Sequence, residues 1–374
     1  MENELQEIDY HFAGEETIPS PALVYREDII EENIEKAISM AGGMERMWPH
    51  VKTYKNSAVI GMLMAKGIKR FKCATIAEAE MCARCGAEHI LVAYPLVGPA
   101  IGRFIRLAQL YSNSTFWATG DNLEQVSLLG AAGQAAGLKI PFLVDVNSGM
   151  NRTGVSLDGG VLSDFCMRTG SISGINLMGF HCYDGNLGIK DRGLREAAVV
   201  EETKKVLAAR NAIEACGQKL PVMVMGGTPT FPFHIRNKEA FLSPGTCFIQ
   251  DHGYDSKYKD IVFKPGAALL TRVISSTRAD LFTLDLGYKA ISSDQEGDRG
   301  VIAGLNRARP ESHSEEHWVF RVSEGVCPAV GTILYVVPTH ICSTTVLYPG
   351  GYVVRGRRLV NYWEFEARNR KISI

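Results

Sequence analysis

The feature that most constrains the fold is a regular alternation of short apolar runs and amphipathic stretches between residues 46 and 251. Between most of the runs lie helical patterns such as IAEAEMCARCGA and REAAVVEETKKVLAARNAIEACG. Strand–helix alternation is typical of a parallel sheet. A count of eight strands favours a closed (β/α)8 barrel over a doubly wound open sheet. The predicted strands span 46–53, 70–75, 89–95, 114–119, 140–146, 175–184, 221–227 and 245–251.

Beyond residue 252 the pattern changes to strand-like runs broken by Gly, Pro, Asn and Asp, such as HWVFRVSE and GTILYVVPTHICSTTVLYP. This pattern predicts a second, all-β domain. The predicted fold class is therefore α/β, a (β/α)8 TIM-type barrel with a C-terminal all-β domain. We expect the barrel to span residues 20–252, and the β domain to comprise residues 1–19 and 253–374.

Composition argues against several functional classes. The formal net charge is −1, so no charge excess points to a nucleic acid or an anionic membrane as partner. No apolar run reaches membrane-spanning length, and the acidic N-terminus is unlike a signal peptide. Nine scattered cysteines favour the reducing cytoplasm over a disulfide framework. The C-x-x-C of Cys82 and Cys85 lies on a helical stretch and is interpreted as helix packing rather than a zinc or redox site.

The segment WPHVKTYKN places Lys52 at the end of the first predicted strand, where functional residues of such barrels lie. A partly buried lysine with a depressed pKa is a nucleophile for carbonyl carbons and forms a Schiff base. Pairing with a strand-end carboxylate such as Asp145 is an equally good reading of the spacing. His50 would share the strand face of Lys52 and either support the chemistry or pack in the core.

A glycine-rich turn, MGGTPT, follows the seventh predicted strand. The backbone N–H groups of Gly226, Gly227 and Thr228 could converge on a phosphate, although an ordinary tight turn reads the same way. A phosphate turn and a Schiff-base lysine at one barrel mouth together indicate pyridoxal 5′-phosphate, whose phosphate and aldehyde need these two groups. Arg152 and Tyr183, which follow the fifth and sixth strands, would then be available to the cofactor ring.

A second candidate site is the PTHICST segment. On a predicted strand, His340 and Cys342 would project from the same face. An imidazole and a thiolate favour zinc among the common metals, with water or substrate completing the coordination shell. In an arbitrary sequence, a histidine beside a buried cysteine is the commoner meaning of this pattern.

Segments along most of the chain, in the same order, resemble the D-threonine aldolase and D-serine dehydratase group, which are fold-type III pyridoxal phosphate enzymes related to alanine racemase. The resemblance implies that Lys52 is the cofactor lysine, that Arg152 bonds the phenolic oxygen and that Tyr183 approaches the ring. It also implies that MGGTPT is the phosphate loop. The segments are WPHVKTYKN, FKCATIAEAEM, HILVAYPLVGP, VDVNSGMNRTGV, GFHCYDGN and PTHICSTT.

The resemblance also reverses the reading of the H-x-C pair. It implies that His340 and Cys342 hold a divalent metal, with zinc favoured by the cysteine and manganese possible. The chain departs from the family pattern at Tyr54, where the family usually has histidine, and at Pro229, where the phosphate loop usually has glycine.

The expected function is that of a pyridoxal phosphate- and metal-dependent lyase acting on D-configured β-hydroxy-amino acids, with Lys52 and His50 as the catalytic residues. The favoured reaction is retro-aldol cleavage to glycine and an aldehyde, as in D-threonine aldolase. The alternative is dehydratase-type elimination from D-serine or 3-hydroxyaspartate, which gives an oxo acid and ammonia. An amino-acid racemase is the third reading, against which the metal pair argues. A cytoplasmic homodimer that binds a small D-amino acid, and neither nucleic acid nor membrane, is expected.

Overall fold

The computed structural model describes residues 8–157, 160–323 and 325–374. The chain forms two compact units. The β unit contains the chain up to Ala37 together with Thr246–Phe365, and the barrel unit contains Ile38–Gly245 and Glu366–Ile374. Compared with the limits predicted from the sequence, the β unit includes residues 20–37 and 246–252 as well.

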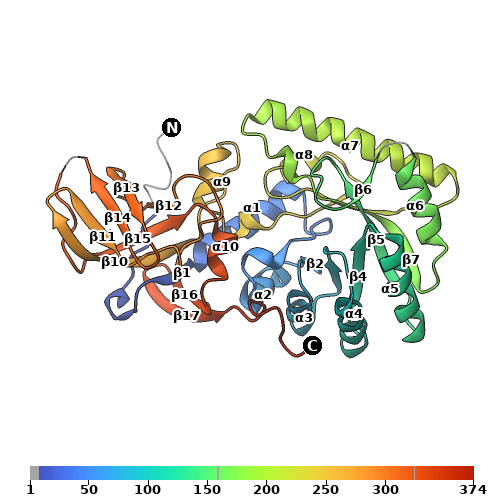
Figure 1. Cartoon of the computed structure of the whole chain (residues 1–374), viewed down its shortest axis with the longest axis horizontal. Coiled ribbons are helices and arrows are strands. Elements are labelled where there is room, and N and C mark those ends of the chain that lie inside the picture. Colours follow the sequence, from blue (N-terminus) through green and yellow to red (C-terminus); the bar gives the residue numbers. More distant parts are fainter. Residues whose placement is uncertain (1–7, 158–159, 324) are drawn as a thin grey trace. The chain divides into compact units, whose positions relative to one another are not determined.

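The barrel unit is built on a curved parallel sheet with helices between its strands (Figure 1). Each strand pairs in parallel with its neighbours, and the short β6 (Val155–Ser156) pairs only with β5. In sheet order the strands are β2 (Arg70–Cys73), β3 (His89–Val92), β4 (Thr115–Gly120), β5 (Ile140–Asn147), β7 (Ile175–Cys182), β8 (Val222–Met225) and β9 (Ala240–Leu242).

Residues 46–50 close this sheet into a ring. Met47 bridges Leu242 of β9, and His50 bridges Lys72 of β2, both in parallel orientation. The Trp48 N–H donates to the Leu242 carbonyl at 2.8 Å, and the Lys72 N–H donates to the Pro49 carbonyl at 2.7 Å. The segment thus occupies the place of the eighth strand, and the (β/α)8 barrel prediction is confirmed.

Two of the predicted strands are wrong in detail. Residues 46–53 form single bridges followed by the 3-10 helix η3 (Val51–Thr53), because Pro49 cannot donate a ladder hydrogen bond. The run 245–251 contains the 3-10 helix η5 (Thr246–Phe248) instead of a strand, and β9 is the true last strand. Residues 247–249 are nevertheless fully buried. An apolar run therefore predicted burial correctly but not conformation.

Four helices of the barrel unit begin at side-chain caps. The side chains of Asn56, Thr75, Asn122 and Asp191 each accept a hydrogen bond from a backbone N–H of the first helical turn. The helix after β8 is a single turn with Pro232 in its first turn. The helices are α2 (Ser57–Ala65), α3 (Ile76–Arg84), α4 (Pro99–Leu110), α5 (Leu123–Ala135), α6 (Val161–Gly170), η4 (Gly185–Leu187), α7 (Arg192–Ala215) and α8 (Phe231–His234).

The β unit is a mainly antiparallel sheet in which the N-terminal strand β1 lies between β10 and β16. The helix α1 (Glu27–Ala41) follows β1, and the boundary between the units falls within it. The unit contains η2 (Glu15–Thr17), β1 (Ala22–Arg26), α9 (His252–Lys257), β10 (Ala267–Arg278), β11 (Leu281–Leu284), β12 (Gly300–Ile302), β13 (Ala308–His313), β14 (Trp318–Val322), β15 (Ile333–Pro338), α10 (Ile341–Thr345), β16 (Gly350–Arg355) and β17 (Arg358–Glu364).

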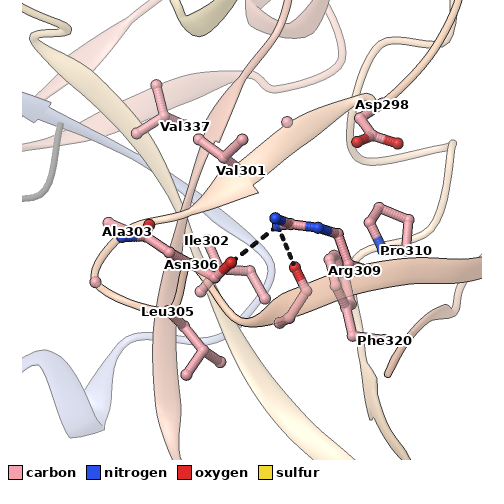
Figure 2. Close-up of a pocket in the computed structure, with 13 residues that line it drawn as sticks. Asp298, Val301, Ile302, Ala303, Leu305, Asn306, Arg309, Pro310, Phe320 and Val337 are labelled. Atoms are coloured by element: carbon pink, nitrogen blue, oxygen red, sulfur yellow. Dashed lines mark hydrogen bonds between the residues drawn. The ribbon is translucent and has the colours of Figure 1, made fainter. Parts of the chain in front are cut away.

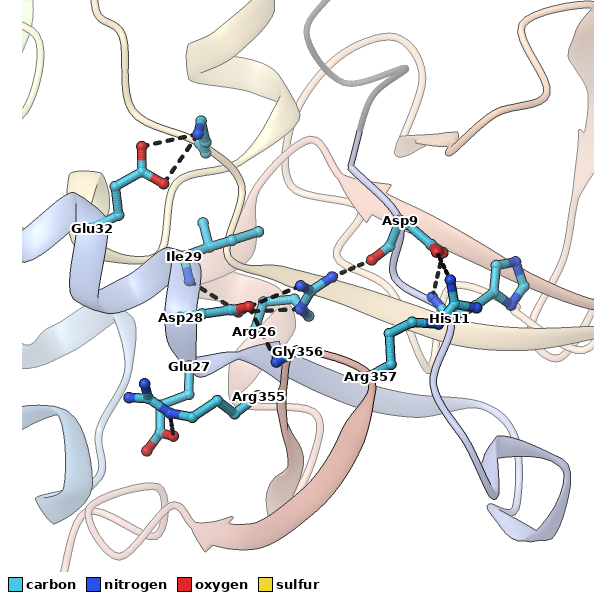
Figure 3. A network of polar contacts seen from close by, with 11 residues as sticks. Asp9, His11, Arg26, Glu27, Asp28, Ile29, Glu32, Arg355, Gly356 and Arg357 are labelled. Carbon is cyan, nitrogen blue, oxygen red and sulfur yellow. Dashed lines mark hydrogen bonds and ion pairs between the residues drawn. The ribbon is translucent and has the colours of Figure 1, made fainter.

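A polar network joins the start of α1 to the turn between β16 and β17 within the β unit (Figure 3). Arg355 donates to Glu27 at 2.7 Å, and Asp28 accepts from the Gly356 N–H at 3.2 Å and from Arg26. Most of these side chains are exposed, so each ion pair contributes little stability. Their effect is to fix which backbone segments of the unit meet. No described helix combines the length and the apolar character needed to cross a membrane.

Trp48 is the central side chain of the barrel interior. It is buried, its ring meets those of Trp117 and Phe241 edge-on with centroids 5.4 Å apart in each case, and its Nε1 donates to the Phe71 carbonyl at 2.9 Å.

We predict that Trp48→Ala lowers the free energy of unfolding by about 3–5 kcal/mol, because it leaves a large cavity and an unpaired carbonyl. Urea denaturation followed by circular dichroism measures this. Leu128→Ala, at a half-exposed site on α5, is the matched control. Equal effects of the two substitutions would contradict this view of the core.

Candidate active site

The turn that carries Lys52 is held by the residue two positions before it. The Lys52 N–H donates to Nδ1 of His50 at 3.3 Å, so the His50 ring is an acceptor at this nitrogen. Burial, together with the charges of Lys52 and Lys72, lowers the pKa of His50 well below its usual value. His50 is therefore neutral at neutral pH with its hydrogen on Nε2. The sequence predicted that His50 shares a strand face with Lys52. In the structure His50 instead caps the turn in which Lys52 lies.

Lys55 leaves the same turn with a left-handed backbone (φ 49°) and forms an ion pair with Glu78 of α3. The Glu78 side chain is fully buried, and its other oxygen accepts from the Ala74 N–H at 2.6 Å. Of the three basic residues in WPHVKTYKN, one is thus a neutral cap and one is paired. The third is Lys52, whose amine makes no ion pair with a carboxylate within the described residues.

The ring of Tyr183 is the point at which the predicted cofactor residues meet. Lys52 Nζ lies 5.8 Å from its centroid, and the guanidinium of Arg152 lies at 5.1 Å. Glycines flank the ring, because a Cβ at Gly185 would come within 2.7 Å of it and one at Gly227 within 3.3 Å. Three segments far apart in the sequence therefore converge at the carboxyl ends of the barrel strands, as expected for an active site in this architecture.

Asp145 and His181 form a buried pair beside this ring. They are register partners on β5 and β7, and Asp145 Oδ1 lies 2.8 Å from His181 Nδ1. Burial raises the pKa of Asp145, but the hydrogen bond and charge of His181, with smaller contributions from Thr153 and Arg152, together leave the pKa lowered. Burial also lowers the pKa of His181. Asp145 is thus engaged by His181, which answers the alternative that it pairs with Lys52.

The glycine turn after β8 differs from the expected phosphate loop. The Gly226 N–H donates to the Cys182 carbonyl at 3.3 Å, and the Gly227 N–H donates to Thr230 Oγ1 at 3.0 Å. These two N–H groups are therefore bonded within the protein. Position 226 requires glycine for two reasons. Its φ of 80° is left-handed, and a Cβ there would approach the His234 ring to 2.9 Å. The Thr228 hydroxyl accepts from the Gly245 N–H at 3.4 Å and marks where the turn meets the loop after β9.

A second buried network supports this turn. Asp184 Oδ2 lies 2.7 Å from His234 Nε2, and Asp184 Oδ1 accepts from Thr230 Oγ1 at 2.8 Å. Because Thr230 also holds the Gly227 N–H, Asp184 links the end of β7 to the glycine turn. No motif in the sequence assigned a role to His234. The signal for Asp184 was its place directly after a buried strand.

In the β unit, His340 and Cys342 lie at the start of α10 rather than on a strand. The strand prediction was wrong because β15 ends at Pro338, and His340 becomes the N-cap of a helix. The two side chains still interact. Burial lowers the pKa of His340, but the hydrogen bond and charge of Cys342 outweigh this and raise it to about 9.

The surroundings of this pair contain one feature of metal-binding histidines. His340 Nδ1 lies 2.6 Å from Asp294 Oδ2, an arrangement that orients the ring and leaves Nε2 for a ligand. Asp251, whose pKa burial raises to about 6, accepts from the Ile341 N–H at 3.1 Å. Within the described residues, no group of three or more His, Cys, Asp or Glu is arranged to hold a metal. His340 and Cys342 therefore provide a two-residue donor set.

Two other features do not form sites of this kind. The pocket beside β12 and β13 is lined by the residues of Figure 2, and its Arg309 donates to the carbonyls of Asn306 and Ala308. Arg309 is thus bound to its own loop. The C-x-x-C pair diverges, since Cys82 Sγ lies 3.6 Å from Cys73 Sγ whereas Cys85 Sγ faces the Ser57 carbonyl.

Comparison with known proteins places the chain in a family. The model described as "Alanine racemase, N-terminal domain" matches residues 26–251, which is more than half of the chain. The chain belongs to this family. A second model, described as "Putative serine dehydratase domain", matches residues 266–354.

Relatives of the chain have names of one chemical type. It is 27% identical to the D-threonine aldolase of an Arthrobacter species, over 86% of this chain and 84% of that protein. It is also 27% identical to the 3-hydroxy-D-aspartate aldolase of Paracoccus denitrificans (95% and 94%), and 24% identical to the D-threo-3-hydroxyaspartate dehydratase of a Delftia species (93% and 97%). The crystal structure of D-threonine aldolase from Filomicrobium marinum matches with a TM-score of 0.88 at 25% identity, over 95% and 96% of the two chains.

The cofactor of this family is pyridoxal phosphate, and the residues at the mouth of the barrel fit it. Lys52 offers an amine that forms no ion pair with an acidic side chain in the described part of the chain, and Arg152 offers a guanidinium beside the Tyr183 ring. Backbone lies close at two points, since a Cβ at Gly245 would come within 2.9 Å of the His50 carbonyl oxygen and one at Gly227 would crowd Tyr183. The donor set and the glycine-lined surface are those that an anionic, planar aldehyde requires.

The buried Lys55–Glu78 pair generates a prediction. Glu78→Gln removes the negative partner of a lysine that is only 13% exposed, so we expect unfolding free energy to fall by about 3–5 kcal/mol. Thermal and urea denaturation measure the change. Glu88→Gln breaks the exposed pair of Glu88 with Lys69 and serves as the matched control, with no measurable change expected. If both variants unfold like the wild type, the buried pair does not stabilise the Lys52 turn.

Proposed function

We propose that the protein is a pyridoxal phosphate-dependent lyase that cleaves D-configured β-hydroxy-amino acids, releasing glycine and an aldehyde. The observation that carries the proposal is the Lys52 amine, which pairs with no carboxylate among the described residues and lies beside Tyr183 and Arg152 at the barrel mouth. The support from relatives is that two of those described above are aldolases of such substrates.

The residues of the chain would share the work as follows. Bound pyridoxal phosphate supplies an electron sink for the bond pair left at the substrate's α-carbon. Lys52 would hold the aldehyde carbon, and Arg152 would donate to the phenolic oxygen of the cofactor ring. At the turn from Gly226 to Thr228 the Thr228 hydroxyl would be the phosphate donor, because the N–H groups of Gly226 and Gly227 are bonded within the protein. His50 keeps Lys52 in place by accepting from its N–H.

Elimination is the second candidate reaction. A dehydratase removes the α-proton and the β-hydroxyl, and the product hydrolyses to an oxo acid and ammonia. The Delftia relative is a dehydratase and is 24% identical to this chain, against 27% for the two aldolases. We favour the aldolase on this small difference. A racemase is the third reading; it has no use for the His340–Cys342 pair.

His340 and Cys342 are proposed as the ligands of a divalent metal, with zinc preferred because one ligand is a thiolate and manganese as the alternative. Asp294 orients the imidazole through Nδ1. The metal would supply a Lewis acid for an oxygen ligand. A homodimer in the cytoplasm, with no nucleic-acid or membrane partner, stays a prediction from the sequence.

The first test follows Lys52. The purified protein loaded with pyridoxal phosphate should show a visible absorbance band, because Lys52 holds the cofactor, and Lys52→Ala should lose both the band and activity. With D-threonine the expected products are glycine and acetaldehyde, measured by chromatography; D-serine and 3-hydroxyaspartate are tested in parallel. Lys69→Ala, an exposed lysine, is the control and should keep the band. Pyruvate, oxobutanoate or oxaloacetate as product would establish the dehydratase instead. A wild type without the band would refute both.

The second test follows the metal. His340→Ala and Cys342→Ala should each bind less zinc, measured by plasma mass spectrometry, and should lose activity because the Lewis acid is lost. Cys327→Ala removes another partly exposed thiol of the same unit and should change neither. Chelation should abolish wild-type activity, and added zinc or manganese should restore it. Full activity after metal removal would exclude the proposed metal role.

A further inference from the structure

Lys72 is a second lysine at the mouth of the barrel, and nothing above gives it a function. It lies on β2 with only 3% of its surface exposed. Its backbone is fixed against the Lys52 turn, because its N–H donates to the Pro49 carbonyl at 2.7 Å and it bridges His50. Its Nζ lies 5.9 Å from the centroid of the Tyr183 ring, against 5.8 Å for Lys52 Nζ. Two lysine amines therefore flank the same tyrosine.

The Lys72 amine makes no ion pair among the residues that the structure describes. The two carboxylates whose charges act on the Lys72 amine are engaged by other residues: Asp145 binds His181, and Asp184 binds both His234 and Thr230. A buried ammonium without a paired anion is costly, and a methionine or leucine would fill the same space without that cost. The position of this lysine calls for a role that an apolar side chain could not perform.

The electrostatics of the site favour a neutral amine. Burial, followed by the charge of Lys52, lowers the pKa of Lys72 to about 7; Asp184 and Asp145 oppose this shift, and Arg152 adds to it. An amine that titrates near neutral pH exchanges protons readily under working conditions. The groups facing it are His50 and Lys52 from the first segment, Asp145 and Arg152 from β5 and its loop, and His181, Tyr183 and Asp184 from β7 and its loop.

The other basic groups of the site each have a contact of their own, although His181 Nε2 is buried without a hydrogen-bond partner among the described residues. Lys52 is assigned to the cofactor aldehyde. His50 uses Nδ1 to accept from the Lys52 N–H, and His181 uses Nδ1 to bind Asp145. Lys72 is the lysine at the Tyr183 ring whose amine is assigned neither to the cofactor nor to the support of other residues.

We propose that Lys72 is a second acid–base residue of this site, which accepts a proton from the substrate's β-hydroxyl group while Lys52 is occupied by the cofactor. This inference rests on the proposed function. The Lys72 nitrogen forms a bond to the hydroxyl proton, and the O–H electron pair becomes the second bond of the released aldehyde. The Cα–Cβ pair remains on the α-carbon until the Lys72 ammonium returns the proton there. Glycine is then formed and the neutral amine is restored.

The first experiment measures Lys72 itself, without turnover. The lysines of the full chain are reductively methylated with ¹³C-formaldehyde, and the resonance absent from Lys72→Met identifies Lys72. Its chemical shift should titrate near pH 7, well below the ordinary lysine range. In Lys52→Met the midpoint should move upward, because a repelling positive charge is removed. Titration of Lys72 at the ordinary lysine pKa would overturn the inference.

The second experiment uses the loaded enzyme. Lys72→Met should keep the visible cofactor band and its KM, and should lose kcat by about 100-fold or more. Wild-type kcat should fall as pH decreases through about 7, since only the neutral amine accepts a proton, and this inflection should vanish in the variant. Lys69→Ala is the matched control and should retain the wild-type profile.

Chemical rescue separates acid–base action from a structural role. Lys72→Ala should regain activity with added primary alkylamines, and the gain should depend on the pKa of the amine. Loss of the cofactor band in Lys72→Met, an unchanged pH profile, or no rescue by amines would each refute the acid–base role. A wild type that never binds the cofactor would instead refute the proposed function. In that case the ¹³C titration still reports whether the Lys72 pKa is lowered.

Discussion

The backbone pairing of residues 46–50 with two strands at once is the interaction on which the site depends. On one side the Trp48 N–H bonds to Leu242 of β9, and on the other the Pro49 carbonyl accepts from Lys72 of β2. This double pairing closes the barrel and fixes the point at which the chain turns into η3. Lys52 follows directly, held by its N–H bond to His50. Without the ring closure, Lys52 and Lys72 would have no fixed relation to the Tyr183 ring.

The mouth of the barrel contains more basic than acidic side chains, and the carboxylates near it form pairs with other residues. Glu78 neutralises Lys55, Asp145 binds His181, and Asp184 binds His234. These pairs hold the loops while leaving Lys52, Lys72 and Arg152 around one aromatic ring. Such a cluster is unfavourable in an empty barrel, because like charges repel and burial disfavours charge. A phosphate-bearing cofactor supplies the missing negative charge, so binding and local stability are coupled.

Polar residues of the β unit have two different roles: some connect segments of the chain, and others present donor atoms. Its Arg355, Arg357 and Arg26 bond to acidic partners near the surface and connect segments from the two ends of the sequence (Figure 3). His340, by contrast, is oriented by Asp294 and contacts Cys342 at the first turn of α10. The first kind of contact specifies which strands meet. The second presents two donor atoms, which is why the metal proposal is made for this pair.

The architecture could be predicted from the sequence alone and the candidate cofactor residues could be named from it, because strand–helix alternation and strand-end motifs are local patterns. It placed Lys52, Arg152 and Tyr183 at strand ends, and the structure brings all three to one ring. Tertiary structure alone decided the rest. Long-range pairing turned 46–53 into bridges and a 3-10 turn, and burial made His50 a neutral cap. The glycine turn bonded its own N–H groups, and Lys72 came to lie beside Lys52. None of these is visible locally, because each depends on which distant strand lies next to the residue.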